Sequence, residues 1–182
     1  GDVYDGEAVV ANTGAACSAR SGVTEAIDPF IRGDMAAVQL AKPPSYMGDL
    51  PFKSPEGADV TLSDWNGKIV VFNLWATWCA PCRAEMPALS NLQTALSGED
   101  FEVVAVNIDT SGAERPLAFL GEVDVANLPL YADPTMDLFN TLKQKGLAFG
   151  MPTTLIVDKD GCQVAHLSRP AVWDSDDAKA LV

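Results

Sequence analysis

The feature that most constrains this chain is a pair of cysteines, Cys79 and Cys82, separated by Ala80-Pro81. An apolar and β-branched run at 69–75 precedes the pair and predicts a buried strand. Apolar residues recur at helical spacing after it, as far as Leu96, and predict a helix that begins near Cys79. Two thiols three residues apart on one helical turn share a face, so they can close a disulfide with little backbone movement. The pattern therefore predicts a pair that stores and releases two electrons.

The two cysteines are expected to have different roles. Unpaired backbone N–H groups and the positive end of the helix dipole favour a thiolate at the start of a helix, which makes Cys79 the expected nucleophile. Cys82 lies one turn deeper. It is the natural resolving thiol, because it can attack the mixed disulfide that Cys79 forms with a partner protein. The expected chemistry is thiol–disulfide exchange.

A C-x-x-C pair is also half of a zinc site, and Cys162 and His166 are the candidates for the other half. Their segment follows an Asp160-Gly161 turn and predicts a strand, on which residues four apart are separated by roughly 13 Å. Cys82 and Cys162 are 80 residues apart, far more than in compact structural zinc modules. We therefore expect no bound metal and no cofactor.

Composition limits the remaining possibilities. A chain of 182 residues with 48% apolar residues fits one globular domain. Its formal charge of −13 argues against nucleic acid and anionic lipid and favours basic partners. No apolar run reaches the ~18 to 20 residues of a membrane span, and the first residues lack the pattern of a signal peptide.

Two cysteines, Cys17 and Cys162, lie outside the motif, and neither has another cysteine within helical reach. We predict that they pair with each other. A bridge over 145 residues would restrict the unfolded chain and, on the loop-entropy model, add up to roughly 4 to 5 kcal/mol to stability. A permanent disulfide beside a redox pair implies an oxidising compartment, either the periplasm or the exterior.

Strand and helix patterns alternate along the chain. This predicts an α/β fold with a mixed central sheet and helices on both faces. Further helices are expected at 28–41, where Lys42-Pro43-Pro44 ends the pattern, and at 113–122, from Asp133 and at 174–182. Further strands are expected at 50–53, 59–62, 101–108, 128–131, 153–157 and 163–167.

Three stretches at 73–87, 150–154 and 156–161 together resemble the thioredoxin superfamily, and more closely its TlpA-like branch of periplasmic thiol–disulfide proteins. The resemblance covers 45–182 and implies a thioredoxin fold. Residues 1–44 would form an N-terminal extension with one helix packed on that domain. Residues 110–145 are similar to the insertion that this branch carries between the two halves of the sheet.

The resemblance also implies roles for residues near the cysteines. Pro152 would be a cis-proline facing the disulfide, and the backbone of Met151 would pair with an extended substrate segment. Trp78 would shield the disulfide while leaving one edge open. Thioredoxin has a buried carboxylate behind its disulfide, but this chain has Asn73 there. The proton of Cys82 must then pass to water or to Glu85, although a first-turn glutamate is more often part of a solvated helix face.

By the same resemblance, the protein would be a periplasmic reductant, tethered to the inner membrane by an N-terminal anchor absent from this chain. Its partners would be a Sco-like copper chaperone, the copper-binding subunit of cytochrome oxidase and a membrane electron donor. Reduction of apocytochrome c is an alternative. A second alternative is a Sco-like copper-binding chaperone with His166 as a ligand, but such proteins place three residues between their cysteines and this chain has two.

Overall fold

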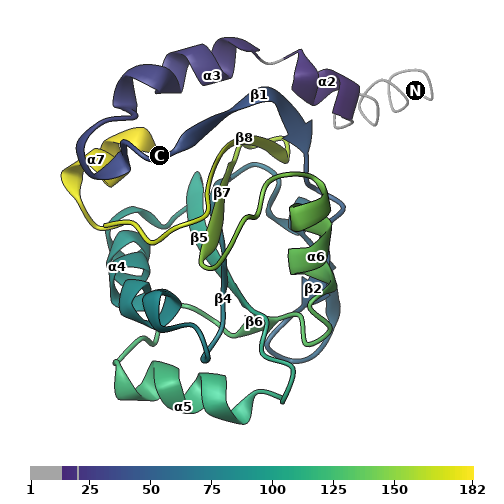
Figure 1. Ribbon diagram of the computed structural model, residues 1–182, viewed down its shortest axis with the longest axis vertical. Coiled ribbons are helices and arrows are strands. Elements are labelled where there is room, and N and C mark those ends of the chain that lie inside the picture. Colours follow the sequence, from purple (N-terminus) through teal and green to yellow (C-terminus); the bar gives the residue numbers. More distant parts are fainter. Residues whose placement is uncertain (1–13, 20) are drawn as a thin grey trace.

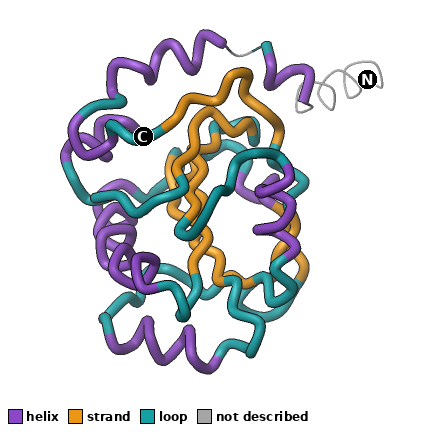
Figure 2. Tube along the Cα trace, in the orientation of Figure 1, coloured by secondary structure: helices purple, strands orange, loops and turns teal. Residues whose placement is uncertain are grey.

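The structure is a computed structural model, and it describes residues 14–19 and 21–182. Its described part is built on one eight-stranded sheet, ordered β1-β8-β7-β4-β5-β6-β2-β3 (strands orange in Figure 2). The strands are β1 (Gln39–Tyr46), β2 (Pro51–Lys53), β3 (Asp59–Thr61), β4 (Ile69–Trp75), β5 (Phe101–Asn107), β6 (Tyr131–Ala132), β7 (Thr153–Val157) and β8 (Cys162–Leu167).

Helices lie on both sides of the central strands, which confirms the predicted mixed α/β architecture. Figure 1 shows α4 and α6 on opposite sides, with α5 below them in that view. The helices are α2 (Gly14–Ser18), α3 (Ser21–Ile27), α4 (Ala80–Leu96), α5 (Glu114–Glu122), α6 (Asp137–Gln144) and α7 (Asp176–Leu181). The patterns at 69–75, 80–96 and 101–108 were the most regular, and their elements lie within a residue of the predicted bounds.

Strand β4 is the central strand that carries the motif, and apart from its first residue it is buried throughout. It pairs in parallel with β5 and antiparallel with β7. In the second pairing Leu74 lies opposite Thr153, so the last residues of β4 and the first residues of β7 lie at the same end of the sheet. This register brings the loop before β7 to the turn that follows β4.

The helix predicted over 28–41 is wrong. Two short 3-10 turns, Asp28–Phe30 and Gly33–Met35, occupy its first half, and β1 occupies the end. Gly33 has φ of +54°, a left-handed conformation that interrupts a helix. The apolar spacing in this segment instead reflects scattered contacts with the core, where Met35 and Val38 are buried.

The prolines expected to stop that helix lie within β1. This strand is at the edge of the sheet, where the missing N–H of a proline need not break a hydrogen-bond ladder. Its pairing with β8 shifts register between Leu40 and Ser45, around Lys42-Pro43-Pro44. The expected boundary between residues 44 and 45 therefore falls inside a strand, so the N-terminal extension contributes to the sheet.

The described part of the extension contains two α-helices, α2 and α3, rather than the single helix expected. Both pack along β1, and residues 1–13 and 20 lie outside the described part. The extension also reaches the C-terminal helix α7. The Asp177 carboxylate accepts a hydrogen bond from the Asp34 backbone N–H at 3.1 Å and lies 3.8 Å from Arg32 Nε.

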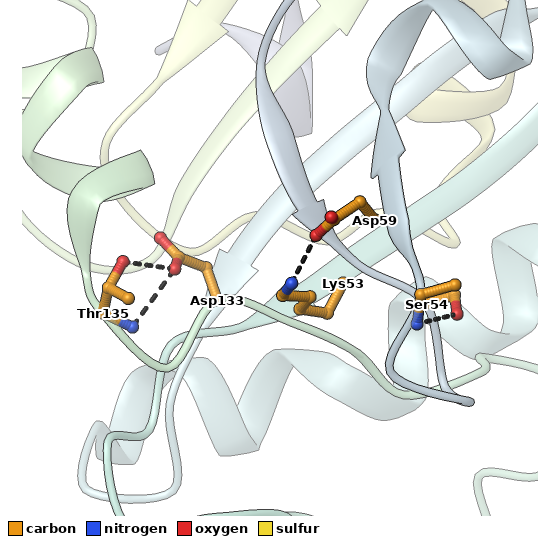
Figure 3. A network of polar contacts seen from close by, with 6 residues as sticks. Lys53, Ser54, Asp59, Asp133 and Thr135 are labelled. Atoms are coloured by element: carbon orange, nitrogen blue, oxygen red, sulfur yellow. Dashed lines mark hydrogen bonds and ion pairs between the residues drawn. The ribbon is translucent and has the colours of Figure 1, made fainter.

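Residues 110–145, expected to be an insertion, contain α5, β6 and α6. Helix α6 begins four residues later than the Asp133-Pro134 pattern predicted. The reason is that the Asp133 carboxylate accepts hydrogen bonds from Thr135 N and Oγ1, at 3.1 and 2.6 Å (Figure 3). It also accepts one from Leu138 N at 2.7 Å, so it caps the helix from outside. Nearby, Lys53 and Asp59 form an ion pair across the β2–β3 hairpin (Figure 3).

Candidate active site

Cys79 lies between β4 and α4, Cys82 lies in the first turn of α4, and the two are joined by a disulfide with their Cα atoms 5.2 Å apart. Cys79 is the N-cap of α4, and its Sγ accepts a hydrogen bond from the Cys82 backbone N–H at 3.3 Å. A sulfur that receives a helical N–H at the positive end of the helix dipole is stabilised as a thiolate. Cys79 is 6% exposed and Cys82 is fully buried. A partner's sulfur can therefore approach Cys79 but not Cys82.

Three apolar residues lie at the end of the sheet that carries the motif. Trp78 is 54% exposed, and the loop before β7 brings Met151 and Pro152 to the same edge of the sheet. The Met151–Pro152 peptide bond is cis, as the resemblance implies. Within the described residues the Met151 backbone makes no hydrogen bond to another backbone group. Phe149, two residues earlier, is 75% exposed and was not singled out from the sequence.

Glu85 lies one turn beyond Cys82 on α4, and its side chain is buried rather than solvated. Residues three apart on a helix share a face, so Glu85 lies on the same side of α4 as Cys82. Burial raises the pKa of Glu85 to about 7, and hydrogen bonds from Ala171, Trp173 and Asn73 act in the opposite direction without offsetting it. The carboxylate can therefore gain or lose a proton near neutral pH.

Asn73 does not act in place of a buried carboxylate. Its side chain instead donates a hydrogen bond to a buried carboxylate, that of Glu85. Its Nδ2 donates to Glu85 Oε1 at 3.1 Å and to Thr154 Oγ1 at 3.0 Å. The side-chain oxygen Oδ1 of Asn73 is buried and has no hydrogen-bond partner in the described residues. Where thioredoxin has a carboxylate, this chain thus has an asparagine hydrogen-bonded to a carboxylate of α4.

The other oxygen of Glu85 is held by the C-terminal segment. Oε2 accepts hydrogen bonds from the Ala171 N–H at 2.8 Å and from Trp173 Nε1 at 3.0 Å. Trp173 is fully buried. No local sequence pattern connects this tryptophan to a glutamate 88 residues earlier.

Cys17 and Cys162 form the second disulfide, with Cα atoms 5.5 Å apart and both side chains fully buried. It ties α2 to the start of β8. Because β7 runs away from the motif and β8 follows it after a turn, this disulfide lies at the opposite end of the strands from Cys79. Cys162 thus has no free thiol to share with His166. Among the described residues no group of three His, Cys, Asp or Glu side chains is placed to hold a metal ion.

His166 lies on β8, opposite Gln39 of the edge strand. Its side chain is half-buried, which lowers the pKa of its imidazole, and Nδ1 is 3.4 Å from Gln163 Oε1.

Within the described residues, no helix is long and apolar enough to cross a bilayer.

Comparison with known proteins adds to this geometry. YneN of Bacillus subtilis, a thioredoxin-like protein, is 33% identical over 119 residues, which are 62% of this chain and 64% of that protein. The thiol-disulfide oxidoreductase ResA of Geobacillus thermodenitrificans is 30% identical over 135 residues, 72% of this chain and 70% of that protein. The chain spans less than two thirds of the length of YneN and of several other ResA proteins that it matches.

The fold has a solved counterpart in a thiol:disulfide interchange protein, DsbE, from Chlorobium tepidum. Its TM-score is 0.65 at 29% identity, over 79% of this chain and 96% of that one, which confirms the thioredoxin-like fold. The Redoxin family model matches residues 41–182, from the edge strand β1 to the end of α7. Since that match takes in every strand of the sheet and both motif cysteines, the chain belongs to the Redoxin family.

Proposed function

We propose that this protein is a thioredoxin-like thiol:disulfide oxidoreductase that reduces disulfides in partner proteins. One observation carries the proposal. Two cysteines lie at the start of α4, the first with a reachable sulfur, and a buried carboxylate with a pKa near neutrality lies one turn behind the second. The Redoxin family match and the names of the similar proteins support the same chemistry.

The first step uses Cys79 of the reduced protein. Its thiolate attacks one sulfur of the client disulfide, so that a Cys79–client bond forms and the client's own S–S bond breaks. The departing client sulfur takes a proton from water. The N-cap position lowers the cost of the attacking thiolate, because a backbone N–H and the helix dipole stabilise its charge.

The second step uses Cys82 and Glu85. The Cys82 thiol gives its proton to the Glu85 carboxylate, and the resulting thiolate attacks Cys79 Sγ. The Cys79–Cys82 bond forms, and the second client sulfur leaves and is protonated. Two electrons have then passed to the client, and Glu85 returns its proton to solvent. A pKa of about 7 suits a group that must both accept and release a proton at neutral pH.

The client chain would bind as an extended segment along Met151. This backbone is free of other backbone hydrogen bonds and lies at the edge of the sheet that carries the motif. Pairing through main-chain groups accepts many sequences, because it uses no side chain of the client. Exposed Trp78 and Phe149 would supply apolar contacts on either side.

The direction of transfer is proposed to be reductive. Ala80-Pro81 places no cation between the cysteines, so this dipeptide adds nothing to the stabilisation that the helix gives the Cys79 thiolate. A less stabilised thiolate corresponds to a more stable disulfide and hence to a more reducing couple. An electron donor, expected in the membrane, must return the pair to the thiol form after each cycle.

The Cys17–Cys162 disulfide supports an oxidising compartment, and we place the protein in the periplasm. Tethering by an N-terminal membrane anchor follows from the TlpA-like resemblance, as do the clients. These are a Sco-like copper chaperone and the copper-binding subunit of cytochrome oxidase, with apocytochrome c as the alternative. Copper sites of this kind need reduced cysteines, since thiolates bind copper and disulfides do not.

The test is a reaction with defined clients. Cys82→Ser protein is incubated with each purified, oxidised client, and the adduct is mapped by mass spectrometry. We expect a mixed disulfide through Cys79 with the Sco-like chaperone and with the copper-binding subunit. Reduced wild-type protein should convert both to thiols, faster than it reduces apocytochrome c.

Cys79→Ser is the matched control, because it removes the other sulfur of the same pair and should form no such adduct. Faster reduction of apocytochrome c would move the assignment to cytochrome c maturation. Failure of the Cys82→Ser protein to form an adduct with any disulfide, small disulfide substrates included, would remove the proposed activity.

A further inference from the structure

A groove of about 450 Å³ lies beside the motif, between the start of α4 and helix α5. One wall belongs to the segment that carries the disulfide, since Thr77 and Arg83 bracket Trp78–Cys82 in the sequence. The other wall is α5, and the full lining is Thr77, Arg83, Arg115, Ala118, Phe119 and Glu122. The groove is therefore within reach of a polypeptide bound at Cys79.

The α5 wall is one face of a fixed helix. Its four lining residues have the spacing i, i+3, i+4 and i+7, which places them on one side of a helix. Phe119 seats that helix on the end of β4, with its ring centroid 5.7 Å from that of Trp75. Because Trp75 is fully buried, the position of α5 relative to the motif is set by the core.

The opposite wall is also held in place. The Thr77 backbone N–H donates to Asp109 Oδ1 at 2.8 Å, and the Thr77 hydroxyl donates to Oδ2 of the same residue. Asp109 is buried and also accepts a hydrogen bond from Asn107 Nδ2. Both of its carboxylate oxygens therefore accept hydrogen bonds from within the protein. Arg83 Nη1 donates to the Thr77 carbonyl oxygen at 2.6 Å, which orients the guanidinium.

The groove is a cationic place on an acidic protein. The chain carries 25 acidic against 12 basic residues, yet two of its arginines line this groove. Neither Arg83 nor Arg115 forms an ion pair with any residue in the described part of the chain. Glu122 also lines the groove, but it is seven residues from Arg115 on α5, about 10 Å along the helix axis.

We propose that this groove binds a carboxylate side chain of the client, located next to the client's reactive cysteine. The inference rests on the proposed function, and it adds a rule for choosing clients. Guanidinium groups bind carboxylates through paired, charge-assisted hydrogen bonds. Main-chain hydrogen bonds along Met151 would bind an extended client whatever its sequence. The two arginines would add a preference for an acidic residue at one position of the client. The overall charge would repel acidic clients, so a local cationic groove is what allows them to approach.

The experiment uses three disulfide-bonded peptides that differ at one position beside the reactive cysteine, which is Glu, Gln or Lys. Reduced wild-type protein should reduce the Glu peptide about three- to tenfold faster than the Lys peptide, the range expected for an exposed charge pair and its reversal. Arg115→Glu should reverse that order, and Glu122→Gln should increase the preference for Glu. Added salt should diminish every difference.

Lys143→Glu is the matched control. It makes the same charge change at an exposed position on α6, and it should leave the peptide preference unaltered. Equal rates for the three peptides in wild-type protein, or an unchanged order in Arg115→Glu, would overturn the groove proposal while leaving the activity intact. If no peptide is reduced at all, the proposed function itself fails. If the wild-type protein prefers glutathione disulfide to all three peptides and Arg115→Glu loses that preference, the groove binds a small disulfide substrate and not a client protein.

Discussion

Replacing Glu85 by Gln should change how the stability of the protein depends on pH. Burial raises the pKa of Glu85 from an ordinary 4.5 to about 7 in the folded protein, so folding favours its neutral form. The stability that this group contributes is fully present below pH 4.5 and is lost as the pH rises through 7. At about 1.4 kcal/mol for each pH unit between the two values, the complete loss is about 3.5 kcal/mol.

The effect is largest between pH 5 and pH 8.5. Within that interval the two pKa values correspond to a loss of about 2.5 kcal/mol in the wild-type protein. Gln has nearly the same shape and offers an oxygen to Ala171 and Trp173, but it has no proton to exchange. The free energy of unfolding of Glu85→Gln should therefore fall less between pH 5 and pH 8.5, by about that amount.

Urea unfolding of the fully oxidised proteins at both pH values gives the comparison. Taking the difference between variant and wild type removes the contribution of every other titrating group. Glu102→Gln is the control, because Glu102 also accepts a tryptophan N–H, from Trp65 at 2.9 Å, but is less deeply buried. Equal pH dependence in wild type and Glu85→Gln would show that Glu85 titrates as in the unfolded chain, and the proton-acceptor assignment would lose its basis.

Two further predictions concern distant supports of the site and of the fold. Trp173→Phe keeps the buried ring but removes a donor that stabilises the charged form of Glu85, so the inflection in the pH–rate profile of client reduction should move to higher pH; Trp65→Phe, which also removes an indole N–H from a carboxylate, should not move it. Replacing Cys17 and Cys162 together by Ser should lower the free energy of unfolding by about 2 to 5 kcal/mol in urea titrations, with an unchanged rate on a small disulfide substrate, because that bridge is far from the motif; a stability loss below 1 kcal/mol would count against it.

The central elements could be predicted because their signals are local. Strand β4 is an apolar run interrupted only by Asn73, and α4 has a stripe of core-facing residues one helical turn apart, so neither depends on distant partners for its type. The motif itself fixes which cysteines face each other, since three residues make one turn. For the same reason Cys79 could be expected at the helix start.

Strand β1 could not be predicted in this way. Its two prolines exclude it from the interior of a sheet, and only its place beside β8, at the edge, makes a strand possible there. The burial of Glu85 was hidden for a similar reason. On α4 alone it could have faced either solvent or the core, and the residues that decide between the two, Asn73 and Trp173, come from β4 and from the last dozen residues of the chain.

The hydrogen bonds from the C-terminal segment to Glu85 bear on how small a working version of this protein can be. A shortened chain that stopped after Ser168 would retain both motif cysteines and the Met151–Pro152 loop. It would lose two of the three groups that solvate the carboxylate in place of water. Such a shortened chain would keep the two redox-active cysteines, but the pKa of Glu85 would change. The C-terminal segment should therefore be retained in any minimal version of the protein.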